Sequence, residues 1–219
     1  MKNQRLAAQI TGWSLILMTL LSGYALGYAY QTVYQAEPIL SPGQLIRQHL
    51  GTYELMIGAL GLIVLLDLIV SFGFYYFFQK DNQAIALVAT GLRMVYSIVF
   101  ALAIYRLAQN LKLPGDGWIM ENFRLFQFTW SLGLIIFGVH LILIGILMKI
   151  HKKIPNVFWY LMLLAGFSYS LIHTLKIALP QIQEVTQSME TLLAAPMALG
   201  EILFAVWLVI KGGRVKATP

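Results

Sequence analysis

Six long apolar runs, separated by short polar breaks, constrain this chain more than any other feature. They cover about residues 8–30, 50–78, 84–109, 126–149, 156–178 and 192–211. A helix needs roughly 20 apolar residues to cross the hydrocarbon core of a bilayer, so each run is long enough. The runs are continuous rather than alternating, which excludes the strands of a membrane β-barrel. The sequence therefore predicts an all-α membrane protein, one domain (residues 1–219) built as a bundle of six transmembrane helices.

Charge content supports the same class. Only 11% of the 219 residues are charged and 59% are hydrophobic, whereas a soluble domain carries roughly a quarter charged residues. The net charge of +6 does not indicate nucleic-acid binding, because no soluble basic face exists to carry it. The chain has no cysteine, which excludes disulfides and thiolate metal sites.

Lysine and arginine are distributed unevenly between the two sides of the predicted bundle. If the termini and the breaks near residues 80 and 151 are cytoplasmic, that side holds nine basic residues and the other holds five. The cytoplasmic set is Lys2, Arg5, Lys80, Lys149, Lys152, Lys153, Lys211, Arg214 and Lys216. Basic residues are enriched in cytoplasmic loops, so both termini are predicted to be cytoplasmic. We expect membrane lipids, including anionic ones, as partners of this side.

The beginning of the chain raises two further expectations. The first apolar run is longer than the core of a typical signal peptide, so we expect a retained helix there. Residues 31–49 carry apolar side chains between Pro38 and Pro42. We expect this segment to lie along the outer surface as a lid.

Four ionisable residues lie deep inside the apolar runs: Asp67, Arg93, His140 and Glu201. Counted from the cytoplasmic end of each helix, they lie about 9 to 12 residues in, which at 1.5 Å per residue agrees within about one helical turn. An unpaired charge at this depth costs about 2.5–3.5 kcal/mol on insertion scales. The sequence therefore predicts a polar cluster at one level of the bundle interior, in which Asp67 meets Arg93 across a tight hairpin.

Polar neighbours extend the cluster on the same helix faces. Tyr96 follows Arg93 by three residues, and Tyr169 belongs to a stripe that also contains Gly166, Ser170 and His173. The candidate ligand-binding residues are Asp67, Arg93, Tyr96, His140, Tyr169 and Glu201. A purely structural cluster, locking helices together through hydrogen bonds, is the alternative. Groups of both signs together with a titratable imidazole favour a site.

Three functions are consistent with this cluster. The first is binding, with translocation as an extension, of a small or lipid-like ligand, in which Arg93 holds an anionic group, Asp67 orients Arg93, and Glu201 and His140 exchange protons. The second is an intramembrane enzyme acting on a lipid-like substrate, with His140 and Glu201 as acid–base pair; catalytic residues are otherwise unassigned, although Ser97, Ser168 and Ser170 lie nearby. The third is a structural or regulatory membrane subunit.

The polar residues of the runs do not suit a metal or haem site. No cofactor is predicted. Arg93 would repel a metal ion bound by His140, Glu201 and Asp67, and His173 lies about 13 Å above His140, too far for a shared haem or metal. Small residues such as Gly58, Gly61 and Gly138 suit either a homo-oligomer contact or internal packing.

Several stretches resemble a bacterial membrane family, domain of unknown function 4386. The resemblance covers about residues 50–212 and rests on the segments "LLDLIVSFGFYYFF", "ATGLRMVYSIVFA", "FGVHLILIGILM", "IPNVFWYLMLLAGFSYSL" and "PMALGEILFAVWLVIKGG". It implies a six-helix inner-membrane protein and names no activity. It also implies that the family pattern includes Asp67, Arg93, His140, Gly200 and Glu201.

Overall fold

The described part of the chain consists of helices joined by short turns. A computed structural model describes residues 2–34, 40–113 and 115–213, and no strand occurs in these ranges. The long helices are α1 (Lys2–Ser22), α4 (Leu50–Phe78), α5 (Gln83–Gln109), α6 (Asp116–Ile150), α7 (Asn156–Ala178) and α8 (Gln183–Ile210). Shorter elements join them: the π-helix η1 (Gly23–Ala29), α2 (Tyr30–Tyr34), α3 (Pro42–Gln48) and the 3₁₀ turns η2 (Asn110–Lys112) and η3 (Pro180–Ile182). The predicted all-α class is confirmed.

Six helical stretches are long and apolar enough to cross a membrane. They are Gln4–Tyr34, Leu50–Phe78, Gln83–Lys112, Asp116–Ile150, Asn156–Ala178 and Pro180–Ile210. The predicted number of apolar helices is therefore confirmed within the described ranges. Two of the basic residues assigned to the cytoplasmic side, Arg214 and Lys216, lie outside the described residues.

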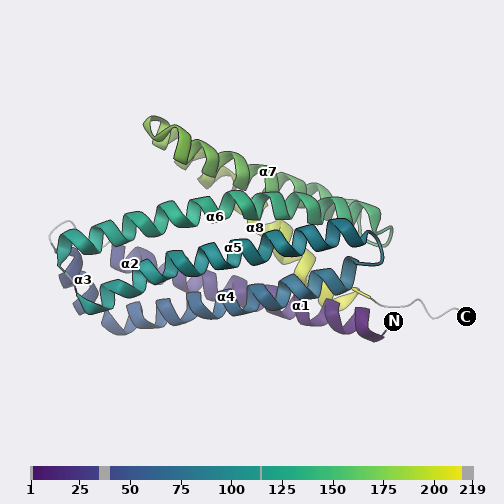
Figure 1. Ribbon diagram of the computed structural model, residues 1–219, viewed down its shortest axis with the longest axis horizontal. Helices are drawn as coiled ribbons and strands as arrows, with labels where there is room; N and C mark the ends of the chain where they lie inside the picture. Colours follow the sequence, from purple (N-terminus) through teal and green to yellow (C-terminus); the bar gives the residue numbers. More distant parts are fainter. Residues whose placement is uncertain (1, 35–39, 114, 214–219) are drawn as a thin grey trace, which may run out of the picture.

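The long helices form a closed ring in chain order. Each packs against the next one along the chain, and α8 packs back against α1. Figure 1 shows the elongated bundle with α1 beginning and α8 ending at one end of it, and with α7 diverging from α6 toward the other end. We call the end with Lys2 and Ile210 the closed end, and the end with α3 and η3 the open end.

Two helices are longer than predicted. The fourth long helix, expected at about 126–149, begins at Asp116, and the sixth, expected at about 192–211, begins at Gln183. The extra turns consist of polar stretches such as "QEVTQSME". Hydropathy detects only the apolar part of a helix that can cross the hydrocarbon core, so these polar turns were predicted as loop. Acidic residues in the first turn of both helices, Asp116 and Glu184, stabilise these beginnings by facing the positive end of the helix dipole.

The second half of the expected lid segment forms the short helix α3, which packs on the bundle. Ser41 begins α3 with a reciprocal capping box to Gln44. The backbone N–H of Gly43 donates to Asp116 Oδ1 at 2.8 Å, and Leu45 and Ile46 are buried. Residues 35–39 of the segment lie outside the described residues. The described half is thus fixed to α6 at the open end.

Large apolar side chains cover the outside of the ring. They are exposed on every long helix, as with Leu17, Leu65, Leu87, Leu132, Phe167 and Leu203. A water-soluble protein rarely exposes so extensive an apolar surface. This surface therefore fits contact with lipid acyl chains.

Close packing joins the helices at the closed end. Arg5 of α1 donates to carbonyl oxygens at the end of α8, among them Val209 O at 2.6 Å and Gly212 O at 2.8 Å. The last carbonyl groups of a helix have no partner within the helix, and the guanidinium of Arg5 supplies hydrogen bonds to them. A Cβ at Gly12 would lie 2.7 Å from Ala205 O, so α1 and α8 are in backbone contact.

A second close approach joins α6 to α7. A Cβ at Gly138 would lie 2.5 Å from Gly166 O, and one at Gly166 would lie 2.6 Å from Gly138 O. Small residues at such a crossing let two helix backbones approach closely. Of the two roles expected for Gly138, internal packing is therefore the one that the structure shows.

Candidate functional site

A buried ion pair joins α4 to α5 halfway along the bundle. Arg93 Nη2 lies 2.5 Å from Asp67 Oδ1, and both side chains are 1% exposed. Neither oxygen of Asp67 accepts a hydrogen bond from any other described group, and Arg93 Nε donates none within the described ranges. The guanidinium carbon also lies 5.3 Å from the centre of the Phe137 ring and 5.8 Å from that of Phe74. The structure thus places Asp67 and Arg93 in the contact that their sequence positions predict.

His140 of α6 completes this network on the side of Arg93 opposite Asp67. Its Nδ1 lies 2.8 Å from Ala89 O and its Nε2 lies 3.3 Å from Arg93 Nη1. A carbonyl oxygen only accepts and a guanidinium only donates, so Nδ1 carries the proton and Nε2 accepts. His140 is therefore neutral in this arrangement, with both ring nitrogens engaged.

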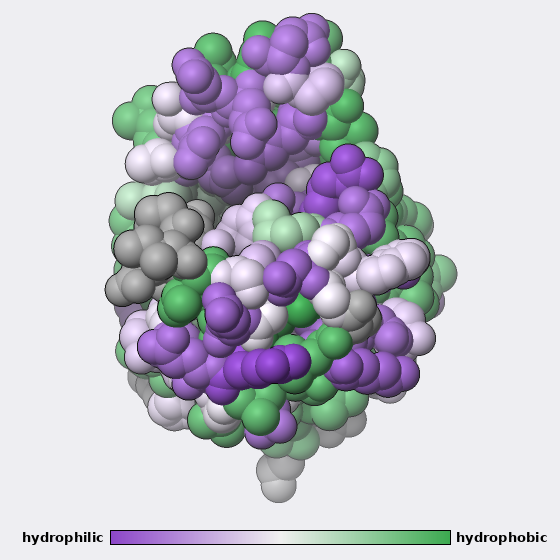
Figure 2. Space-filling view, turned by 90° about the vertical axis from the view of Figure 1, so that its left-hand side faces the viewer, coloured by the Kyte–Doolittle hydropathy of each residue, from purple (hydrophilic) through white to green (hydrophobic). Residues whose placement is uncertain are grey.

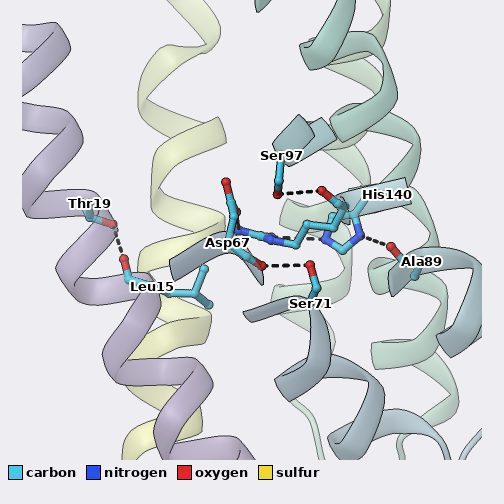
Figure 3. A network of polar contacts seen from close by, with 8 residues as sticks. Leu15, Thr19, Asp67, Ser71, Ala89, Ser97 and His140 are labelled. Atoms are coloured by element: carbon cyan, nitrogen blue, oxygen red, sulfur yellow. Dashed lines mark hydrogen bonds and ion pairs between the residues drawn. The ribbon is translucent and has the colours of Figure 1, made fainter. Parts of the chain in front are cut away.

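Hydroxyl groups satisfy the helix backbone around the network. Ser71 donates to Asp67 O at 2.8 Å and Ser97 donates to Arg93 O at 2.9 Å. Thr90 donates to Ala86 O at 2.8 Å and reaches Ser71 O of the neighbouring helix at 3.3 Å. Figure 3 shows Asp67 on the side of the network that faces α1 and α8, with His140 and Ala89 on the opposite side.

An inner cavity of about 340 Å³ lies on the Asp67 side of the network. All six long helices contribute to its wall, one residue from each being Leu15, Asp67, Arg93, Trp130, Tyr169 and Glu201. Ala194 and Ala198 of α8 and Thr19 of α1 also line it and are themselves exposed. The cavity is therefore open sideways between α1 and α8 in the half of the bundle nearer the open end.

Besides Asp67 and Arg93, the sequence predicted four candidate residues, and only three of these line the inner cavity. Tyr96, Tyr169 and Glu201 line the inner cavity, and no hydrogen bond or ion pair of Glu201 occurs in the described part of the chain. His140 is fully buried and does not line the cavity. The structure therefore does not bring His140 and Glu201 together, and direct proton exchange between them is not supported.

A second, polar hollow of about 520 Å³ opens at the open end, and we call it the outer vestibule. It lies between the α7–α8 hairpin and the α2 and α6 helices, and its wall includes Gln31, Arg124, Gln127, Lys176 and Gln187. Trp130 and Glu190 line both the vestibule and the inner cavity. Figure 2 shows hydrophilic side chains gathered over this end, with a hollow below the part formed by the hairpin. The two hollows are therefore neighbours, with Trp130 and Glu190 between them.

A compact polar cluster lies in the vestibule. His173 Nδ1 lies 3.1 Å from Ser131 Oγ, and His173 Nε2 lies 4.0 Å from Glu190 Oε1. Glu190 also forms an ion pair with Lys176. These residues come from α6, α7 and α8, so the cluster holds the diverging hairpin to the bundle.

Serines near the ion pair serve the backbone. Ser97 donates to Arg93 O as described above, and Ser170 donates to Ile135 O at 3.1 Å. No group of three or more His, Cys, Asp or Glu suited to hold a metal ion occurs in residues 2–34, 40–113 and 115–213.

Sequence reasoning missed two residues that line both hollows. Glu190 lies before the apolar run predicted at about 192–211, so it was not expected in a helix of the bundle. Trp130 is the other, and its buried Nε1–H lies beside the Tyr96 hydroxyl. A tryptophan in mid-run, away from the interfaces where tryptophan is usually found, was the available signal.

The sequence matches one described protein family. A family model described as Domain of unknown function (DUF4386) matches residues 10–212. The chain belongs to that family. The match to DUF4386 begins at residue 10, whereas the resemblance read from the sequence began at about residue 50, so α1 is part of the family's shared unit. An uncharacterized protein of Archaeoglobus fulgidus is 27% identical over 161 residues, which are 72% of this chain and 86% of that protein. No solved structure matches the chain.

Proposed function

We propose that this DUF4386 protein binds a small or amphipathic ligand in the inner cavity and lets it pass between the cavity, the outer vestibule and the bilayer. The proposal includes insertion in the cytoplasmic membrane with both termini inside, as the distribution of lysine and arginine favours. The observation that carries it is the cavity itself, whose wall draws on all six long helices and ends at the Asp67–Arg93 pair.

Cavity size and lining support binding over a purely structural cluster. Ligand pockets typically measure about 300–1,000 Å³ and are mostly apolar with a few convergent polar groups. The inner cavity, at about 340 Å³, combines Leu15, Ile63 and Leu134 with the polar groups of Asp67 and Glu201. Protein interiors hold few voids of this size, so the space beside the cluster favours binding.

The first test asks whether a ligand occupies the cavity. We expect native mass spectrometry of protein released gently from its own membrane to show a bound adduct. Ala194→Trp fills the cavity and should abolish the adduct. Leu199→Trp is the matched control, because Leu199 is exposed on the same helix and does not line the cavity. Absence of an adduct from the wild type, or equal adducts in both variants, would contradict the proposal.

The second test asks whether the path is open and from which side. The chain has no cysteine, so a single serine-to-cysteine variant reports on one position alone. We expect a charged methanethiosulfonate applied outside intact cells to label Ser131→Cys in the vestibule and Ser22→Cys in the cavity. Ser71→Cys, buried beside the network, should stay unlabelled. Labelling of Ser131→Cys only from the cytoplasmic side would reverse the proposed orientation.

A second candidate function is acyl transfer at the vestibule cluster. Ser131, His173 and Glu190 follow the order of nucleophile, base and orienting group. It ranks second because the backbone N–H groups around Ser131 are used within α6, so no backbone oxyanion site accompanies the serine. Covalent labelling by a fluorophosphonate, lost in Ser131→Ala, would establish it. Absence of labelling in the wild type would remove it.

A further inference from the structure

Two carboxyl groups of the inner cavity have oxygens without partners within the described part of the chain. Asp67 Oδ2 is a fully buried acceptor without a hydrogen bond. Glu201, which is partly buried, lines the cavity with no hydrogen bond or ion pair. Two buried donors belong to the same wall: Arg93 Nε–H, and Trp130 Nε1–H, which lies beside the Tyr96 hydroxyl. Buried polar groups in native structures are nearly always paired, so an acceptor such as Asp67 Oδ2 calls for an explanation, and a bound ligand is one.

Arg93 does not supply a free positive charge to this space. Its Nη2 is paired with Asp67, its Nη1 donates to His140, and its face lies over Phe74 and Phe137. The anion-holding role expected for Arg93 from the sequence is therefore already filled by the protein's own Asp67.

Three carboxyl groups line the cavity, and one of them has no cationic partner. Asp67 balances Arg93, and Glu190 at the boundary with the vestibule is balanced by Lys176. Glu201 is the carboxyl group left over. Carboxylate oxygens are acceptors that suit an ammonium N–H donor, and a charge of this kind inside a helical bundle marks a ligand or ion path.

Aromatic side chains lie beside these acceptors. Tyr96, Phe100 and Trp130 line the same cavity. The faces of aromatic rings attract cations, and cages of such rings are used to recognise quaternary ammonium groups. Leu15, Met18 and Leu134 provide the apolar part of the wall.

We infer that the inner cavity takes an organic cation, a protonated or quaternary amine with an apolar body, whose charged head lies between Asp67 and Glu201. This inference rests on the proposed function and specifies its ligand class. The apolar body fits the sideways opening between α1 and α8, where Thr19 and Ala198 are exposed, so an amphipathic amine can reach the site from the bilayer.

Three probes that share a phenylethyl body and differ in the charge of the head group test the charge preference. They are 2-phenylethylammonium, the neutral 2-phenylethanol and the anionic 3-phenylpropanoate, added to the full chain in lipid nanodiscs and measured by titration calorimetry against empty nanodiscs. We expect the cation to bind at least about tenfold more tightly than either of the others. We also expect Glu201→Gln to weaken cation binding at least about tenfold, while Glu54→Gln, which removes an exposed carboxylate of α4, leaves it unchanged.

The outcomes separate this inference from the proposed function. Preference for the alcohol or the anion, or no binding of any probe, overturns the cation inference. The adduct test with Ala194→Trp then decides independently whether the cavity binds anything. The comparison of the three probes needs only the wild-type protein, so it stays informative if Glu201→Gln fails to fold. Equal cation binding by Glu201→Gln and wild type would also overturn the inference.

Discussion

α1 contacts its neighbours very differently at its two ends. At the closed end a Cβ on Gly12 would lie 2.7 Å from Ala205 O of α8, and one on Gly73 of α4 would lie 1.9 Å from Thr11 Oγ1. In η1, which continues α1 toward the open end, Gly23 and Gly27 are exposed and a Cβ on either would meet nothing within 4 Å. Glycines of the closed end are therefore held in close helix contacts, whereas these two glycines lie on the outer face of the bundle.

Helices separate on two sides of the ring toward the open end. α7 diverges from α6 there (Figure 1), and α1 and α8 line the inner cavity with exposed side chains. The ion-pair network lies between the tightly packed half and the open half. The contrast teaches that a bundle of apolar helices can keep a cavity if close packing is concentrated at one end. Four predictions test how much each half contributes.

The largest effect is expected at the ion pair. Asp67→Asn leaves the guanidinium of Arg93 buried without its counter-charge, which costs about 3–5 kcal/mol. A chain of this length loses roughly 2–4 °C per kcal/mol, so the melting temperature of the purified protein should fall steeply. Glu54→Gln, an exposed carboxylate on the same helix, is the control. An unchanged melting temperature for Asp67→Asn would show that the pair does not hold the two helices.

A double variant sharpens this prediction. Replacing both partners together, as in Asp67→Leu with Arg93→Met, removes the charges without leaving one unpaired and should restore most of the stability. The same variant should lose the adduct seen by native mass spectrometry. Retention of the adduct would locate the ligand elsewhere.

The next effect is expected at the backbone contact between α1 and α8 in the closed end. Gly12→Val places side-chain atoms against the backbone oxygen of Ala205, which cannot move without separating α1 from α8. Overpacking of this kind costs about 1–3 kcal/mol. Thermal unfolding followed by tryptophan fluorescence measures it. A neutral result would show that α1 shifts along α8 with little resistance, which contradicts a rigid closed end.

A smaller effect is expected from the cap on α8. Arg5→Ala removes a charged donor from Leu208 O, Val209 O and Gly212 O. Charged hydrogen bonds at a helix C-terminus suggest a loss of about 1–2 kcal/mol for this partly buried group. Hydrogen exchange should then rise in the last turn of α8 and remain unchanged in α5. A uniform rise along the bundle would indicate that Arg5 stabilises more than the closed end.

The smallest effect is expected at Gly23, the exposed first residue of η1. Gly23→Ala adds a methyl group where nothing lies within 4 Å. Alanine is favoured over glycine inside helices by about 0.5–1 kcal/mol, so the melting temperature should stay the same or rise slightly. Gly12→Ala is the matched substitution at the closed end and should lower it. Similar losses at both glycines would remove the contrast between the two halves.

Much of this fold can be predicted from the sequence, because apolar run length fixes where a helix can cross hydrocarbon. The level shared by Asp67, Arg93 and His140 also follows from counting residues along each run. Rotation about the helix axis does not follow, and it decides that His140 faces Arg93 and Ala89 whereas Glu201 faces the cavity. Polar helix ends such as Gln183–Glu190 were missed because they carry no hydropathy signal.

The π-helix at Gly23–Ala29 has a mechanical consequence. A π turn holds more residues than an α turn. If this stretch became α-helix, the residues after it would rotate about the helix axis, by about 100° for each residue by which the register shifts. Tyr30, whose hydroxyl accepts from Gln127 Nε2 at 3.1 Å and whose ring packs against Phe123 and Phe126, would turn out of that contact. The wide turns therefore set the direction in which Tyr30 points, and its contact with α6 depends on their geometry.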